Sequence, residues 1–445
     1  MFKSRFSKAA LALCAGLYLF HLSFVWRYAV NVPYFDEWES FNPDQLPAGL
    51  SLRWLFAQHN EHRMATNKLL IWSLYQVNGW DVAAHQVLNF ILYGALVAFV
   101  IYFTTKLSPE APDWVAPCFA VFLLSTAGIQ NHAMAYQSAF HFWLLFFLVS
   151  ARALFDASQR TAALAAGCAA SVLSIYSLAS GVVSSVVLLA GFALFKASRA
   201  YGSGGGAARG RELLQLLLVT AAIGGAVALW LAGYAKPPQH PRLAGPFGAE
   251  FWDYFLNVLS FCFGVDSFSK AAGVVCLVVV LTPVCVPFVK GGAESSPERW
   301  AALSTAACLL AVLASVAAGR AAFGAAQAKS SRYAEFGMVL VPLAAVSWAG
   351  LLRHNKRMGA DLLIMLWAAL FAAFLNNWRF RDYRVEHAGR LKGVECVRSY
   401  YLAGGDGLCP VLYPAPLAER LESAKKLDAA FYRDLNLPAG GGEVK

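Results

Sequence analysis

Long apolar segments alternate with short polar segments along most of the 445-residue chain. The apolar segments are about 17 to 22 residues long, close to the roughly 20 residues that a helix needs to cross the hydrocarbon core of a bilayer. Because hydrocarbon offers no hydrogen bonds to the backbone, such a segment must be helical there. The pattern predicts an all-α polytopic membrane protein with about eleven transmembrane helices, at 9–30, 82–105, 113–128, 137–155, 161–178, 180–196, 213–233, 271–290, 300–318, 335–352 and 361–378.

Composition supports this class, since 58% of the residues are hydrophobic and only 14% are charged, which is too apolar for an ordinary soluble protein. Lysines and arginines gather on one set of loops, which predicts a cytoplasmic N-terminus and an exterior C-terminal tail. These cytoplasmic flanks account for much of the net charge of +10, so nucleic acid is not an expected partner. The basic start of the first span lacks a small-x-small cleavage site, which favours a retained anchor. We therefore expect a multi-pass protein of a bacterial inner (plasma) membrane.

Two polar regions stand out, one within the predicted transmembrane domain, residues 1–378, and one after it. The first exterior loop, 31–81, mixes Leu and Trp with charged residues, a pattern typical of helices that lie in the membrane interface. The second is a small exterior C-terminal segment, 379–445, which carries Cys396 and Cys409. An exterior location permits a disulfide between them, although spacing alone leaves open whether it forms.

The stretch VPYFDEWES places Asp36 and Glu37 among aromatic residues, shortly after the first span. A carboxylate held against apolar surface has a raised pKa and is a better general base. Both residues are therefore candidate catalytic groups. The same acidic and aromatic cluster would also suit a sequence that only marks the outer water interface.

The run QHNEHR and the lysine that follows it form a second group of candidates, namely His59, Glu61, His62, Arg63 and Lys68. Cations on neighbouring helical turns can hold a phosphate by charge-assisted hydrogen bonds. Two histidines three residues apart could instead bind zinc from one helical face, although the protease motif HExxH is absent. A solvated face of an interfacial helix remains the third interpretation.

A third group lies in GRAAFGAAQAKSSRYAEFG, where Arg320, Lys329, Arg332 and Tyr333 occur in a predicted exterior loop. Basic residues here run against the orientation rule, which makes them candidates for substrate binding; snorkelling of Arg332 to the headgroups is the alternative. Other loop residues, such as His132, His141 and His240, are each expected to be ordinary loop groups rather than ligands.

These features resemble the GT-C superfamily of integral-membrane glycosyltransferases, which includes protein mannosyltransferases, aminoarabinose transferases and bacterial arabinofuranosyltransferases. The similarity covers residues 1–380 and consists of the many spans, the acidic pair Asp36 and Glu37 in the first exterior loop, and a second loop with basic residues. It implies an inverting transferase that moves a sugar, with a pentose such as arabinofuranose among the candidates, from a polyprenyl-phosphate donor. The acceptor would be a surface glycan, a lipid or an exported protein such as a pilin.

The resemblance also implies roles for individual residues. Asp36 would deprotonate the acceptor hydroxyl, and Glu37 would orient the acceptor or a cation. Arg63, Lys68, Arg320 and Arg332 would stabilise the departing phosphate, within a wider substrate site that includes His59, Glu61, His62, Lys329 and Tyr333. The resemblance leaves open whether the site binds a divalent cation. The first ligands of such a cation would be Asp36 or Glu37 together with His59 or His62.

Two alternatives remain beside the transferase. A transporter or flippase for a lipid-linked sugar would need ionisable groups along a path at mid-membrane depth, and the predicted spans contain few polar residues of this kind, such as His21 and Asn89. A non-catalytic assembly partner of a surface-polymer complex would depend on no single exterior carboxylate.

Overall fold

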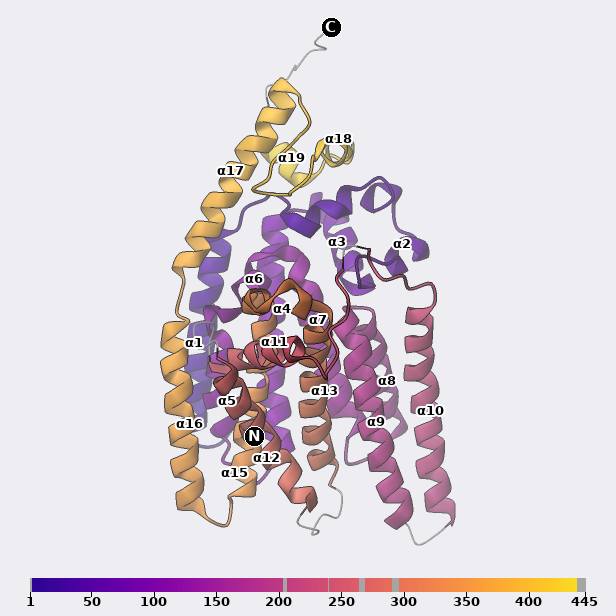
Figure 1. Cartoon of the computed structure of the whole chain (residues 1–445), viewed down its shortest axis with the longest axis vertical. Coiled ribbons are helices and arrows are strands. Elements are labelled where there is room, and N and C mark those ends of the chain that lie inside the picture. Colours follow the sequence, from indigo (N-terminus) through magenta and orange to yellow (C-terminus); the bar gives the residue numbers. More distant parts are fainter. Residues whose placement is uncertain (1, 203–205, 239, 264–268, 290–295, 438–445) are drawn as a thin grey trace.

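The computed structural model describes residues 2–202, 206–238, 240–263, 269–289 and 296–437 (Figure 1). Every regular element in these residues is a helix, and nine helical segments among them are long and apolar enough to cross a membrane. This confirms a polytopic helical membrane protein. The principal helices of the bundle are α1 (Arg5–Tyr28), α4 (Val82–Leu107), α7 (Ser138–Leu154), α9 (Ala179–Gly202), α10 (Gly206–Leu231), α12 (Lys270–Val289), α13 (Pro297–Arg320), α15 (Leu340–Leu351) and α16 (Lys356–Asn376).

Two of the eleven predicted spans form shorter helices. The span predicted at 161–178 is α8 (Thr161–Ile175), and the span predicted at 113–128 is broken into α5 (Val115–Ala120), η3 (Val121–Leu124) and η4 (Thr126–Gly128), followed by α6 (Ile129–Ala133) and η5 (Ala135–Gln137). The count of about eleven therefore stays a prediction.

Side chains of α4 satisfy the backbone groups that the broken helix leaves free. Asn89 Nδ2 donates to the carbonyl oxygens of Asn131 and Met134 at 2.7 and 3.0 Å, and Tyr93 Oη donates to the carbonyl of Leu123. Irregular backbone inside a membrane protein needs such internal partners because lipid supplies none. Polar residues in α4 thus stabilise the neighbouring broken segment.

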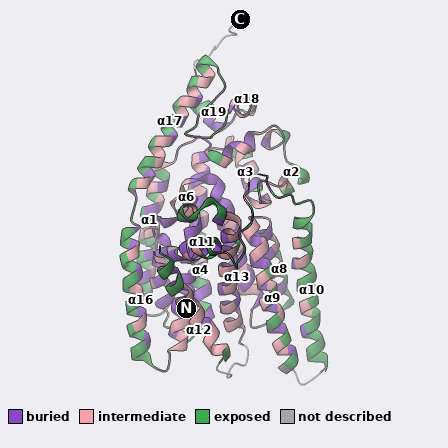
Figure 2. Ribbon diagram, in the orientation of Figure 1, coloured by how far each residue is buried: buried purple, intermediate pink, exposed green. Residues whose placement is uncertain are grey.

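Residues on the outward faces of the bundle are exposed, whereas those on the inward faces are buried (Figure 2). On α10, Leu217 and Leu229 are 64% and 71% exposed, and Ile364 on α16 is 64% exposed. So large an exposed apolar surface would be unfavourable in water, whereas in a membrane it would contact lipid. This pattern is the one expected of helices that face hydrocarbon.

Between α10 and α15 the chain is less regular. Helix α11 (Ala249–Leu259) runs across the bundle axis (Figure 1) and contacts α12 and α13. The segment after α13 contains η7 (Ala321–Phe323), η8 (Ala325–Lys329), η9 (Ser331–Tyr333) and α14 (Ala334–Met338), while η6 (Ser260–Phe263) follows α11.

The first loop and the C-terminal region pack together at one end of the bundle, here called the cap (31–81 and 404–437). The loop contains η1 (Phe35–Phe41), η2 (Leu46–Ala48), α2 (Leu52–Phe56) and α3 (Ala65–Asn78). Helix α17 (Arg381–Ala403) continues upward from α16 and leads to α18 (Ala418–Lys426) and α19 (Ala430–Asp434) (Figure 1).

Aromatic packing and one disulfide hold the cap together. The ring of Phe431 in α19 lies 5.3 Å from Trp38 and 5.6 Å from Phe41, measured between ring centroids. Cys396 and Cys409 are joined by a disulfide with their Cα atoms 5.9 Å apart, which ties α17 to the segment before α18. The disulfide that the sequence left open is thus present.

Candidate functional site

The run QHNEHR forms a tight turn between α2 and α3. The backbone N–H of His59 donates to the carbonyl of His62 at 2.7 Å, and that of His62 donates back to His59 at 2.8 Å. Asn60 adopts a left-handed φ of 48°, which asparagine tolerates better than most residues. The two interpretations that place these residues on a helical face, as a zinc site or as a solvated interfacial face, are therefore wrong, because reciprocal hydrogen bonds replace the helical ones.

Glu37 is completely buried and has both oxygens engaged. Its Oε2 accepts the backbone N–H of Tyr34 at 2.8 Å, and its Oε1 accepts that of Tyr136 at 3.1 Å. Burial raises the pKa of Glu37, while the nearby Arg390 guanidinium and the backbone donors oppose this shift. These contacts make Glu37 an anchor between the first loop and η5, directly before α7.

Asp36, the preceding residue, is half-buried, and in the described part of the chain its carboxylate makes no hydrogen bond or ion pair. It lies within electrostatic range of His59, Tyr136 and Tyr413. The preceding Phe35 has a φ of 47°, which is strained for a bulky residue and is found mostly where the surrounding structure enforces it. A carboxylate with unused acceptor capacity is available to take a proton.

Phe35 is held in that conformation from the other half of the cap, because its N–H donates to the carbonyl of Leu412 at 2.8 Å. Glu39 is likewise held from the C-terminal region. Its Oε1 accepts hydrogen bonds from Tyr413 Oη and from Arg420 Nη2, the latter at 3.0 Å, and Oε2 accepts from Asn42 at 2.6 Å. Burial would raise the pKa of Glu39, but these three partners bring it below the ordinary value.

Glu61 lies at the centre of a second group of charged residues. It pairs with Arg320 Nη2, while His240 Nε2 lies 3.2 Å from its Oε2 and His62 Nε2 lies 3.6 Å from its Oε1. Burial opposes ionisation of Glu61, but His62, Arg320 and His240 lower its pKa overall. The structure therefore brings together three predicted residues, Glu61, His62 and Arg320, and adds His240 from the segment after α10.

His62 is held neutral in this group. Its Nδ1 accepts the backbone N–H of Ala179 at 3.2 Å, so the proton of the neutral ring lies on Nε2, toward Glu61. Burial lowers the pKa of His62 to about 4, and it also lowers that of His59, against the opposing effect of Asp36.

Arg63 and Lys68 are committed to backbone carbonyls. Lys68 Nζ donates to Trp54 and Ala57 at 2.8 and 3.0 Å, and burial lowers its pKa to about 8. Arg63 spans the ends of α2 and α10, donating to the carbonyls of Phe56, Trp230 and Ala232. Cations placed at helix C-termini in this way stabilise the local fold.

The loop after α13 brings Tyr333 and Arg332 into the region of Arg320. Tyr333 is buried and lies within electrostatic range of Arg320, and Arg332 lies within that of Tyr254. Arg332 Nε donates to Ser330 Oγ at 3.1 Å, whereas its two terminal nitrogens donate to nothing in the residues that the structure describes. Lys329 is exposed at the end of η8. Arg332 thus offers two donors to an anion.

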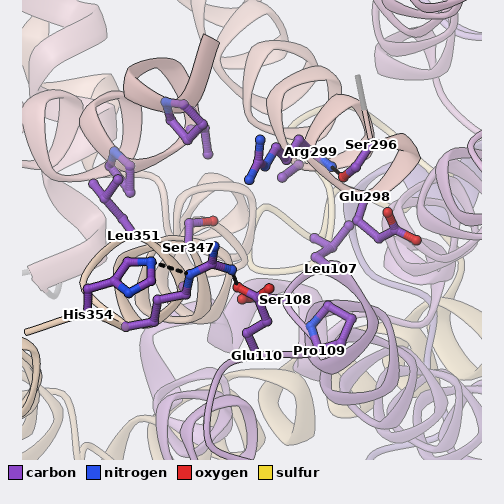
Figure 3. Close-up of a pocket in the computed structure, with 16 residues that line it drawn as sticks. Leu107, Ser108, Pro109, Glu110, Ser296, Glu298, Arg299, Ser347, Leu351 and His354 are labelled. Carbon is purple, nitrogen blue, oxygen red and sulfur yellow. Dashed lines mark hydrogen bonds and ion pairs between the residues drawn. The ribbon is translucent and has the colours of Figure 1, made fainter. Parts of the chain in front are cut away.

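An open pocket of about 570 Å³ lies at the opposite end of the bundle, near Ser108 and His354 (Figure 3). It contains Arg299 and a pair formed by Arg353 and Glu110. None of the predicted site residues lines it, so it is separate from the cap.

The suspected metal ligands Asp36, Glu37, His59 and His62 do not form a compact ligand set. In the ranges that the structure describes, one group of three or more His, Cys, Asp or Glu residues has its ligand atoms within 4.8 Å of one another: His132, His141 and Glu335. Sequence reasoning missed this group because Glu335 lies 194 positions from His141, so no local pattern joins it to the two histidines.

No family model, curated protein or solved structure matches this chain.

Proposed function

We propose that this protein transfers a sugar from a polyprenyl-phosphate carrier to a hydroxyl acceptor, with Asp36 as the general base. The observation that carries this proposal is the carboxylate of Asp36, which is half-buried in the cap and unpaired in the described chain, next to two carboxylates that are fully engaged. A free carboxylate among paired ones is the group able to accept a proton.

The chemistry needs one proton transfer and one substitution. Asp36 takes the proton of the acceptor hydroxyl as its oxygen attacks the anomeric carbon. The bond between that carbon and the phosphate oxygen breaks with inversion, and the polyprenyl phosphate leaves with the bonding pair. Negative charge grows on the phosphate, so fixed cations beside it lower the barrier.

The hydrogen bonds and ion pairs of the basic residues indicate which of them can bind the phosphate. Arg332 has two terminal nitrogens without a partner in the described residues, so it is the first candidate to bind the phosphate. Arg320 shares its charge with Glu61, which leaves it a supporting role. Arg63 and Lys68 hold backbone carbonyls, and we assign them to the framework that positions the loop.

The same proposal places the cap outside a bacterial inner membrane, with the N-terminus in the cytoplasm. The disulfide between Cys396 and Cys409 lies at the junction of α17 and the cap, and disulfides persist in oxidising exterior compartments. A lipid-anchored donor would then reach the cap from the outer leaflet, with membrane lipids around the bundle.

One observation favours the transport alternative. The interior of the bundle contains more ionisable side chains than the sequence of the predicted spans indicated. Four of them lie close together, namely His21, His132, His141 and Glu335. They are completely or almost completely buried. A packed cluster of this kind does not line a path, so we retain the transferase as the main proposal.

The test compares cells that carry wild-type protein, Asp36→Asn or the control Asp44→Asn, each matched for membrane abundance. Asp44 lies in the same loop and is exposed. The masses of surface glycans, glycolipids and exported proteins are then measured. We expect a sugar-sized increment with wild type and Asp44→Asn, and its loss with Asp36→Asn, since a general base contributes about 10²- to 10⁴-fold.

An increment that persists unchanged in Asp36→Asn would remove the proposed base. Purified protein in vesicles provides the second arm: movement of a labelled lipid-linked sugar between leaflets, with no new glycosidic bond, would replace the transferase with a transporter.

A further inference from the structure

Three side chains from separate elements meet inside the bundle. His132 comes from α6, His141 from the first turn of α7, and Glu335 from α14, and the side chains of all three are at most 2% exposed. Asn89, which contacts this group, lies seven residues into α4, about 10 Å from the cap end of that helix at 1.5 Å per residue. The group is therefore distinct from Asp36 and from the charged residues around Glu61.

Asn89 fixes the protonation of His141. Its Nδ2 donates to two backbone carbonyls, so its Oδ1 faces His141 Nδ1, 2.7 Å away, as an acceptor. His141 Nδ1 must then carry a hydrogen, and in the neutral ring the lone pair lies on Nε2. That Nε2 lies 3.1 Å from Glu335 Oε2. Two electron-rich atoms so close together need a cation between them or a proton on one of them.

His132 faces the other oxygen of the same carboxylate. Its Nε2 lies 3.0 Å from Glu335 Oε1, and neither of these buried atoms has another partner among the described residues, while His132 Nδ1 is buried there with no hydrogen-bond partner at all. Buried polar atoms are nearly always paired. Gly128 makes room for the carboxylate, because a Cβ there would lie 2.6 Å from Glu335 Oε1.

We infer that His132, His141 and Glu335 bind a divalent transition metal of the zinc class. Two imidazole nitrogens and a carboxylate form a ligand set typical of zinc. Each imidazole nitrogen lies beside a different oxygen of the carboxylate, His132 Nε2 at 3.0 Å from Oε1 and His141 Nε2 at 3.1 Å from Oε2. One ligand atom of each residue lies within 4.8 Å of the others, and ligand atoms about 2.05 Å from a tetrahedral ion lie about 3.3 Å apart, so a small inward shift would seat the ion. The bond from His141 Nδ1 to the Asn89 oxygen is the outer contact that orients metal-binding histidines.

Three protein ligands leave one coordination position open. His21 lies beside His132, with ring centroids 5.0 Å apart, and its Nε2 lies 2.7 Å from Tyr383 Oη. Its Nδ1 is buried without a hydrogen-bond partner in the described part of the chain.

The experiment uses full-length protein purified in detergent with an affinity tag that contains no histidine. The protein is stripped with a chelator, dialysed and titrated with Zn²⁺, and bound metal is measured by mass spectrometry. We expect about one tightly bound Zn²⁺ per wild-type chain. Glu335→Gln and His132→Gln should weaken binding at least tenfold, and Asn89→Leu about 10- to 100-fold.

Glu61→Gln is the matched control, because Glu61 is also surrounded by histidines but lies in the cap. It should bind Zn²⁺ as wild type does. Wild-type protein that retains no Zn²⁺ would overturn the proposal in favour of a buried imidazolium–carboxylate pair. Binding that survives Glu335→Gln but is lost in Glu61→Gln would overturn it in favour of the cap.

Cobalt provides a measurement on wild type that does not depend on the folding of a variant. Co²⁺ bound by this set should give the intense visible absorption of a four-coordinate site, which excess Zn²⁺ removes. The weak absorption of octahedral Co²⁺ alone would contradict the inferred ligands.

Discussion

Replacing Glu37 by glutamine separates the anchoring role of this residue from the catalytic role proposed for Asp36. The Glu37 carboxylate accepts two backbone N–H groups, from Tyr34 and Tyr136, and lies near the buried Arg390. Glutamine keeps the shape but has one oxygen and one NH₂ group. One backbone N–H would therefore lose its acceptor and face another donor.

The lost charge-assisted hydrogen bond and the buried unsatisfied donor cost about 1 to 3 kcal/mol. Arg390, which is 2% exposed, also loses its opposing charge. We therefore expect a total destabilisation of about 2 to 4 kcal/mol. For a chain of 445 residues, an unfolding entropy of about 2.1 cal/mol/K per residue converts this to a fall of about 2 to 4 °C in the unfolding midpoint.

The assay is thermal unfolding of the purified protein, followed by tryptophan fluorescence. Asp36→Asn is the matched control, because its carboxylate has no partner to lose in the described chain, and its stability should stay within about 0.5 kcal/mol of wild type. A Glu37→Gln variant as stable as wild type would refute the anchoring role. An equal loss in Asp36→Asn would show that Asp36 is also bound by the fold.

Two further predictions concern the cap. Burial lowers the pKa of His62 to about 4, while the value in the unfolded chain is about 6.5, so between these values the unfolded chain binds more protons than the folded one. The free energy of unfolding should therefore fall by up to about 3 kcal/mol as the pH drops through that window. The unfolding midpoint should fall further between pH 7 and 5 in wild type than in His62→Asn, and equal falls would contradict the assignment. Replacing Cys396 and Cys409 by serine removes a disulfide that joins positions 13 apart, which should lower the free energy of unfolding by about 3 kcal/mol. Amide hydrogen exchange should become faster in α18 and α19. Unchanged exchange would show that the aromatic contacts are enough to hold the cap together.

Local pattern and composition were enough to predict the class of the protein. Apolar segments of membrane-crossing length can satisfy their backbone in lipid only as helices, and the structure has nine helical segments of this kind within the described ranges. The polar first loop and tail were also visible as composition changes. The turn at His59 to His62 was not, because it depends on the left-handed conformation of Asn60.

The distinction between Asp36 and Glu37 came only from the tertiary structure. The two carboxylates are adjacent and chemically alike, but the N–H groups that engage Glu37 come from Tyr34 and from Tyr136, which is 99 positions away. Glu39 likewise finds its partners Tyr413 and Arg420 in the C-terminal region. Nothing local in FDEWES identifies which acid stays unpaired.

The buried group of His132, His141 and Glu335 shows the same limit most clearly. The sequence placed the two histidines in a loop and near a helix start, and Glu335 lies 194 positions after His141. Short-range periodicity determines which segments are helical, since it reflects contacts within one helix. Which distant side chains meet depends on how those helices pack, and that packing alone brought the three ligands within 4.8 Å of one another.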